Sequence, residues 1–129
     1  MVHLAVSPEG LLKVMNVYAA IDCGDVVNTD SATAQVEGSI IFALSAALLS
    51  EITIANGRIV QKNFRDYPMI HIADTPNVVT AFIRSDDPLG GLGEPCVPPL
   101  APALANAIYA ASGVRVRELP IKKTPLRRA

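Results

Sequence analysis

A stretch rich in glycine and proline, from Gly90 to Gly113, most constrains how this chain can fold. Glycines at positions 90, 91 and 93 come just before Glu94, and glycine lets a backbone take positive φ and approach other groups closely. Prolines at 95, 98, 99 and 102 then lead into an alanine-rich segment, which predicts a helix from about Ala103 that ends at Gly113. The pattern predicts a loop that presents one carboxylate in front of a helix.

An apolar helix is the second constraint. Residues 32–49 are apolar around nearly the whole helix, which favours burial within a larger body. Residues 29–31 (Thr, Asp, Ser) are good N-cap types, so the helix is expected to start there. Gln35 could hydrogen-bond a buried polar object that approaches the backbone at Gly38, or this face could pack closely against a neighbouring backbone. The small and polar residues of this face are Ser31, Gln35, Gly38 and Ser45.

Turn residues predict the strands. Ser7-Pro8-Glu9-Gly10 has turn chemistry between two apolar runs, which indicates a β-hairpin. Alternation in the second run fails at Met15-Asn16, which is typical of a bulge or of two buried faces. Asn56-Gly57 with β-branched flanking residues predicts a second hairpin, and residues 78–83 predict another strand. The predicted fold class is α+β, with hairpins and a mixed sheet packed against two main helices.

Length and composition fit one domain, residues 1–129, with half of the residues apolar. A net charge of −1 gives no electrostatic footprint for nucleic acid. The exception is the C-terminal tail, which carries basic residues without an acid. A solvated terminus is favoured there over a segment that binds an anionic partner surface. The tail cations are Lys122, Lys123, Arg127 and Arg128.

Metal ligands and membrane signals are not expected. Cys23 and Cys96 lie far apart in sequence and are interpreted as reduced, buried residues, and His3 and His71 are isolated, so no side-chain metal site is predicted. The longest apolar run, 40–49, falls short of the roughly 20 residues that cross a bilayer. The first residues lack the features of a secretory signal. We expect no signal peptide or transmembrane segment, and a cytoplasmic location for the chain as expressed.

Glu94 is the candidate catalytic residue. A carboxylate in an apolar, glycine-lined loop loses hydration, which raises its pKa toward the range useful for a general base. It could equally cap the nearby helix or pair with Arg84. The sequence has no recognisable Ser-His-Asp or Cys-His arrangement and no phosphate loop. The residues alone therefore indicate a lone base in an incomplete site.

Two motifs together resemble a known family. Gly91-Leu92-Gly93-Glu94-Pro95 and the segment 98–120 resemble the C-terminal end of the molybdenum hydroxylases, the xanthine oxidase and aldehyde oxidoreductase family. Asp22-Cys23-Gly24, Val27-Asn28 and Gln35-Val36-Glu37-Gly38 resemble the segment that precedes and opens a helix at the molybdopterin in those proteins. The pattern is most similar to the large (beta) subunit of isoquinoline 1-oxidoreductase and related membrane-associated aldehyde dehydrogenases. The resemblance runs in order from about residue 11 to 121.

The resemblance implies an oxidoreductase that uses water-derived oxygen to oxidise an N-heterocycle or an aldehyde. In that family an Mo–OH oxygen attacks the substrate carbon while hydride passes to a sulfido ligand, and Glu94 matches the base that takes the Mo–OH proton. Gln35 matches a glutamine that hydrogen-bonds the pterin, and the cofactor carries the hard chemistry. The implied cofactor-binding residues are Gln35, Gly38, Gly91, Leu92 and Gly93.

The resemblance also implies partners. In bacterial members the cofactor is usually molybdopterin cytosine dinucleotide, and electrons leave through a separate subunit with two [2Fe-2S] clusters, with a cytochrome as a possible acceptor. Family large subunits are several times longer and can be periplasmic, so the remainder of the large subunit is an expected partner. We expect the cofactor to be absent or incomplete on the isolated chain. The alternative is a catalytically silent α+β module that assembles with other subunits or with itself through the apolar helix, as a homo-oligomer.

Overall fold

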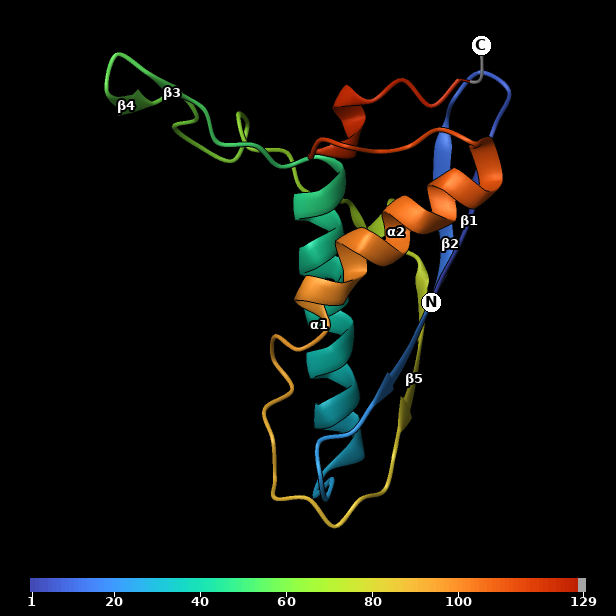
Figure 1. Ribbon diagram of the computed structural model, residues 1–129. Helices are drawn as coiled ribbons and strands as arrows, with labels where there is room; N and C mark the ends of the chain where they lie inside the picture. Colours follow the sequence, from blue (N-terminus) through green and yellow to red (C-terminus); the bar gives the residue numbers. More distant parts are fainter. Residues whose placement is uncertain (128–129) are drawn as a thin grey trace.

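The computed structural model describes residues 1–127 and shows a three-stranded sheet with two helices on one of its faces (Figure 1). The strands are β1 (Val2–Val6), β2 (Leu12–Ile21) and β5 (Asn77–Phe82), in the order β1-β2-β5. β1 pairs antiparallel with β2, and β2 pairs parallel with β5. The sheet is therefore mixed, and the predicted α+β class is confirmed.

The first hairpin forms as predicted. Gly10 takes φ +87° in the turn, and Ser7 donates its backbone N–H to the Leu11 carbonyl at 2.9 Å. His3 pairs with Asn16, but the next residue of β1, Leu4, pairs with Val14. Met15 is therefore an extra residue on β2, which is the bulge that the failed alternation indicated.

The N-cap of helix α1 (Thr29–Leu48) lies one residue before the predicted N-cap residues. Its N-cap is Asn28, which has extended φ and ψ and accepts the Ser31 N–H on its side-chain oxygen at 2.8 Å. Asparagine satisfies this orphan donor as well as serine or aspartate would. The predicted start of the helix at residues 29–31 is therefore confirmed, although the N-cap is Asn28 and those residues form the first turn.

Helix α2 (Val97–Ser112) begins earlier than the prolines suggested. Pro98 and Pro99 lie in the first turn, where backbone N–H groups have no intrahelical partner in any case. Pro102 lies inside the helix, at the cost of one backbone hydrogen bond. The predicted stop is confirmed, since Gly113 is the C-cap with φ 76° and donates its N–H to the Tyr109 carbonyl at 2.8 Å.

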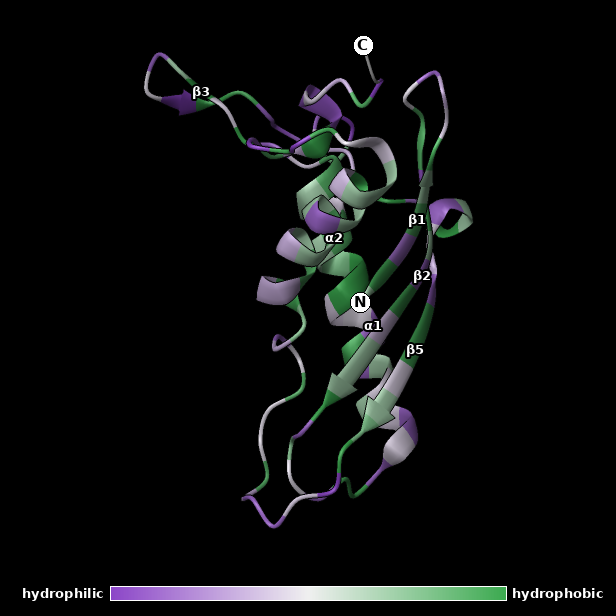
Figure 2. Cartoon of the chain, turned by 45° about the vertical axis from the view of Figure 1, so that its right-hand side comes forward, coloured by the Kyte–Doolittle hydropathy of each residue, from purple (hydrophilic) through white to green (hydrophobic). Residues whose placement is uncertain are grey.

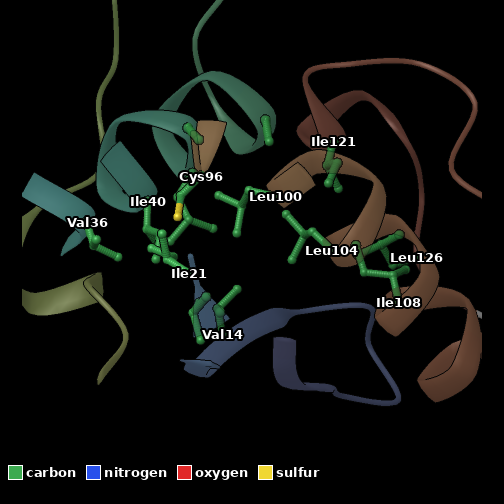
Figure 3. Packing of buried hydrophobic residues seen from close by; sticks show 14 of the residues in the cluster. Val14, Ile21, Val36, Ile40, Cys96, Leu100, Leu104, Ile108, Ile121 and Leu126 are labelled. Atoms are coloured by element: carbon green, nitrogen blue, oxygen red, sulfur yellow. The ribbon is translucent and has the colours of Figure 1, made fainter. Parts of the chain in front are cut away.

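The core fills the space between the sheet and the two crossing helices (Figure 3). α2 packs against β1 and α1, while α1 also contacts β5 and the short 3₁₀ helix η2 (Ile121–Lys123). Ile40, Leu44, Leu104 and Ile108 are at most 1% exposed. Coloured by hydropathy, the strands of the sheet and helix α1 show many apolar residues along their length (Figure 2). This packing fixes α1 and the start of α2 relative to each other.

α1 has one buried and one open face. Its buried face carries Val36, Ile40 and Leu44, while the opposite face leaves Phe42 69% exposed. Length and composition alone would let α1 cross a bilayer, and 44% of that apolar window is buried inside the fold. A core helix meets the same criterion, so this is weak evidence for a membrane span.

The C-terminal segment is anchored, which differs from the predicted solvated tail. Ile121 and Leu126 are buried, and Lys123 forms ion pairs with Glu51 and with Glu118. The Glu51 carboxylate, by its hydrogen bond, raises the pKa of Lys123 above its usual value. The sequence did not reveal the Glu51 partner, because Glu51 is far away along the chain, whereas Glu118 precedes Lys123 by only five residues. Arg128, the last predicted tail cation, lies outside the described residues.

The second hairpin, β3 (Ile54–Ala55) with β4 (Arg58–Ile59), also forms where it was predicted. Asn56 and Gly57 both take positive φ, 51° and 72°, as a type I′ turn requires. The hairpin projects from the far end of α1, away from the sheet (Figure 1). A short 3₁₀ helix, η1 (Ile72–Asp74), follows before β5 returns to the sheet.

Candidate functional site

The loop before α2 lies against the first half of α1, and this contact brings the predicted site residues together. Gly90 donates its backbone N–H to the Cys23 carbonyl at 2.9 Å. Further along the loop, a Cβ added at Gly93 would lie 3.3 Å from Oε1 of Gln35. A side chain at this position would push against the amide. The glycine therefore lets the loop backbone approach the one long polar side chain on this face of α1.

A hollow of about 260 Å³ lies between α1 and this loop, and we call it the Gln35 hollow. Four of the six predicted site residues line it: Gln35, Gly38, Gly93 and Glu94. A Cβ at Gly38 would meet nothing within 4 Å, so the helix surface there is bare and open. The Gln35 hollow is thus lined by the Gln35 amide, by the bare helix surface at Gly38 and by the Glu94 carboxylate.

The other two predicted residues lie elsewhere. Leu92 lines a second hollow, of about 270 Å³, which Gln35 also lines together with Cys23 and Asn28. Gly91 lines neither hollow, and a Cβ there would meet nothing within 4 Å. Gln35 therefore stands between two adjoining depressions, and the loop that carries Leu92 and Gly93 contributes to both.

Glu94 is exposed, which differs from the expected desolvated carboxylate. The loop lies at the surface, and no described part of the chain covers it. Neither structural alternative is found within residues 1–127: α2 has no side-chain cap, and Arg84 forms no ion pair with Glu94. The backbone at Glu94 is joined to the start of α2, because the Glu94 carbonyl accepts the Val97 N–H at 2.9 Å. The start of α2 thus fixes the backbone position from which the carboxylate extends.

Sequence reasoning missed four of the residues that line the Gln35 hollow: Ala34, Ser39, Phe42 and Val97. Phe42 is 69% exposed, and it follows Gln35 by seven residues and Gly38 by four. Residues at these spacings share one helix face, so the spacing could have found it. Nothing in the sequence marked Val97, because its place depends on how α2 starts.

The ends of β2 and β5 are tied together beside this site. Asp22 accepts hydrogen bonds on Oδ1 from the Ser85 hydroxyl and from the Gly24 backbone N–H. Gly24 takes φ +71°, and a Cβ there would lie 2.5 Å from the Asp87 carbonyl oxygen. Only glycine fits this crossing of two backbones. The two strand ends therefore hold the segment that leads into α1.

Stability should depend on pH through Asp22. The Ser85 hydrogen bond, and then the Gly24 N–H, hold the pKa of the Asp22 carboxyl below its ordinary value of 3.8. A depressed folded-state pKa contributes stability above the unfolded-state pKa, and this contribution is lost as pH falls through the folded value. Ser85→Ala should therefore destabilise the chain at neutral pH and make progressively less difference below about pH 4. Urea unfolding of both proteins from pH 7 down to 2 measures this, and a constant difference would contradict it.

Side chains alone do not form a metal site in the described part of the chain. Within residues 1–127, no group of three or more His, Cys, Asp or Glu side chains could hold an ion. Both cysteines are buried and unbonded.

Residues 5–76 match the family described as the molybdopterin cofactor-binding domain. This chain belongs to that family. It is 38% identical over 113 residues to the membrane-bound aldehyde dehydrogenase [pyrroloquinoline-quinone] of Gluconacetobacter polyoxogenes, a match that covers 88% of this chain and 15% of that protein. It is 34% identical over 114 residues to the beta subunit of isoquinoline 1-oxidoreductase of Brevundimonas diminuta, again covering 88% and 15%. The predicted family is confirmed.

Solved structures agree on the fold. Quinoline 2-oxidoreductase from Pseudomonas putida 86 superposes with a TM-score of 0.79 at 25% identity, over 92% of this chain and 16% of that chain. Aldehyde oxidoreductase from Desulfovibrio gigas superposes with a TM-score of 0.80 at 24% identity, over 98% and 14%. The chain thus spans about one seventh of the relatives that it matches. These relatives are oxidoreductases of the molybdenum hydroxylase family.

Proposed function

We propose that this chain is the segment of a molybdenum hydroxylase that places a general base and an amide beside a molybdopterin cofactor. The enzyme would oxidise an N-heterocycle or an aldehyde with water-derived oxygen. One observation carries the proposal: Gln35, Gly38, Gly93 and Glu94 come from two distant segments and line the same hollow, in a chain of this family. Because the chain spans about 15% of its relatives, the rest of the site would come from the remainder of the large subunit.

The residues of the Gln35 hollow fit a flat polar group. The Gln35 amide both donates and accepts hydrogen bonds. Gly38 leaves open space above the helix, and the loop at Gly93 passes close to Gln35, since a Cβ added there would lie 3.3 Å from the amide oxygen. When bound, the cofactor would supply the oxygen transfer and redox chemistry, and we propose its cytosine dinucleotide form. Gln35 would orient it, and the backbone at residues 91–93 would lie against it.

Glu94 would act as the general base. Its carboxylate would accept the proton that leaves the water-derived oxygen as that oxygen attacks the substrate carbon, which requires hydrogen-bond reach between the two. In this chain the carboxylate is exposed. Cover from the remainder of the large subunit would exclude water from the carboxylate. The start of α2 fixes the backbone position of Glu94, and the remainder of the large subunit would determine how much water reaches its carboxylate.

Electron transfer would need other polypeptides. Relatives are named as subunits, such as the beta subunit of isoquinoline 1-oxidoreductase and the molybdenum-binding subunit of xanthine dehydrogenase from Escherichia coli. We propose a [2Fe-2S] small subunit as the first electron acceptor and a cytochrome as a possible later one.

A chimeric subunit tests the proposal. In it, this chain replaces the 114 matched residues of the isoquinoline 1-oxidoreductase subunit from Brevundimonas diminuta, and the chimera is expressed with that enzyme's other components. We expect it to bind molybdenum and to oxidise isoquinoline, whereas the isolated chain should bind little or none. A folded chimera without molybdenum would contradict the proposal. Elemental analysis and turnover measure the two expected results.

Gly38→Ala separates folding from cofactor binding. A Cβ at Gly38 meets nothing within 4 Å, so alanine should stabilise α1 in the isolated chain by about 0.5–1 kcal/mol. In the chimera the same methyl group would fill the face where the cofactor is proposed to lie, and molybdenum content should fall. Urea unfolding and elemental analysis check the two halves. Unchanged molybdenum content would remove Gly38 from the proposed cofactor face.

Self-association is a second candidate function, favoured by the open face of α1. Phe42 is 69% exposed there, next to the exposed Ala34 and Ala46. An apolar face of this kind usually marks an interface. We expect the isolated chain to form oligomers at micromolar concentration and Phe42→Ser to shift it toward monomer, as measured by analytical ultracentrifugation. A strictly monomeric parent chain would exclude this module function.

A further inference from the structure

We propose that residues 51–72, which we call the arm, dock into an apolar groove with an acidic rim on the remainder of the molybdenum-binding subunit. The inference rests on the proposed function, since it assigns this chain to such a subunit. The arm extends from the C-terminal end of α1 (Figure 1), whereas the Gln35 hollow is lined by residues between positions 34 and 42 of that helix.

Most of the arm is exposed in this chain, and only Ile70 at its base packs against the core. None of the residues from 51 to 75 is buried. Ile54 is 74% exposed, Phe64 82% and Ile72 95%. A solvated loop is usually rich in polar residues and poor in aromatic and β-branched ones. An extended segment with this many exposed apolar side chains is instead typical of a binding surface. Its large exposed hydrophobic residues are Ile52, Ile54, Ile59, Val60, Phe64, Met69 and Ile72.

The arm nevertheless has a defined structure, which hydrogen bonds and an ion pair hold together. Its two branches are joined by Thr53 and Gln61, because the Thr53 N–H donates to the Gln61 side-chain oxygen at 2.8 Å and the Gln61 amide donates to the Thr53 hydroxyl at 3.0 Å. Its base is held by the Glu51–Lys123 ion pair and by the Ser50 hydroxyl, which donates to the Pro68 carbonyl at 2.9 Å. A two-stranded hairpin with no buried face is marginal in water. These hydrogen bonds and the ion pair therefore hold the conformation of the arm, and its large apolar side chains are exposed to solvent.

The charges of the arm indicate which charges should line the edge of the groove that it binds. Beyond Glu51, which pairs with Lys123, the arm carries the cations Arg58, Lys62 and Arg65 and the single acid Asp66. Asp66 itself accepts the Lys62 backbone N–H at 3.3 Å. An apolar groove with acidic residues at its edge would complement this surface.

The extent of the family match indicates which polypeptide provides the groove. The match covers residues 5–76 and so contains the whole arm. The arm thus lies within the part of the chain that matches the molybdopterin cofactor-binding domain. This chain spans about 15% of its relatives, so most of such a subunit lies outside it. The covering surface is accordingly assigned to that remainder.

The test compares the same substitutions in two settings. Phe64→Asp and Ile59→Asp should leave the Tm of the isolated chain within about 1 °C, because both side chains are exposed there. In the chimeric subunit they should lower the Tm by several degrees, because a charge would be forced into an apolar contact. Phe64→Leu and Ile59→Val are the matched controls and should have small effects in both settings. Hydrogen exchange should show arm amides that are fast in the isolated chain and slow in the chimera.

Two results would overturn the inference. One is equal effects of the aspartate substitutions in both settings, together with unprotected arm amides in the chimera. The other is arm protection in the isolated chain that grows with its concentration, which would assign the arm to a second copy. These readouts do not use catalysis. A chimera with full molybdenum and turnover but an unprotected arm would reject only the arm, whereas a protected arm in an inactive chimera would reject only the proposed function.

Discussion

Replacing Glu94 by Gln in the chimeric subunit is expected to abolish turnover while leaving the molybdenum content unchanged. Glutamine has the same shape but cannot take a proton at neutral pH. Loss of a positioned general base lowers rates by about 10²–10⁴-fold. The cofactor should still bind, because the Gln35 amide and the bare helix face at Gly38 do not depend on the carboxylate. Steady-state kcat and elemental analysis of the same preparation measure both quantities.

Glu37→Gln is the matched control for this substitution. It makes the same chemical change on α1, and Glu37 lines neither hollow beside Gln35. Turnover in the control should stay close to that of the parent chimera. If Glu94→Gln keeps full activity, Glu94 is not the base. If the variant loses molybdenum, its carboxylate has a role in holding the cofactor instead.

Leu104→Ala should destabilise the isolated chain by about 3 kcal/mol. Leu104 is 0% exposed and lies in the hydrophobic core on the inner side of α2, between Leu100 and Ile108 of the same helix (Figure 3). The substitution removes buried methyl groups and leaves a cavity that neighbouring side chains fill only in part. Because a small domain has a total stability of about 5–15 kcal/mol, this is a large fraction. Urea unfolding followed by circular dichroism gives the difference.

Leu119→Ala is the control for the cavity. Leu119 is 49% exposed, so the same truncation should cost less than about 1 kcal/mol. Equal losses at the two positions would mean that the packing between the helices does not provide the main stabilisation. The position of Glu94 would then also lose its support, since α2 fixes the loop end that carries it.

Local sequence signals predicted most elements of this fold. The Ser7-Pro8-Glu9-Gly10 turn, the irregularity at Met15 and the Asn56-Gly57 hairpin each depend on backbone preferences that act over a few residues. All three were predicted from the sequence and are present in the structure. The errors lie at helix starts, where Asn28 and the prolines after Cys96 are compatible with more than one first residue.

The candidate site was predictable in part. Gln35 and Gly38 could be placed on one helix face by their spacing, and Glu94 could be placed on a glycine loop. Their meeting could not be derived from spacing, because it depends on how α2 packs across α1 and how Gly90 joins Cys23. The hydration of Glu94 could not be derived either, since it depends on which surfaces cover the loop.

The sequence by itself determined the local elements, the family and the identity of the residues that could do chemistry. Tertiary structure alone decided that Gln35 and Gly93 touch, that Glu94 is exposed and that Lys123 pairs with Glu51. The physical reason is the distance along the chain over which each kind of interaction acts. Turn and cap preferences are set by neighbouring backbone groups, whereas burial, close approach and ion pairing depend on residues that only the folded chain brings together.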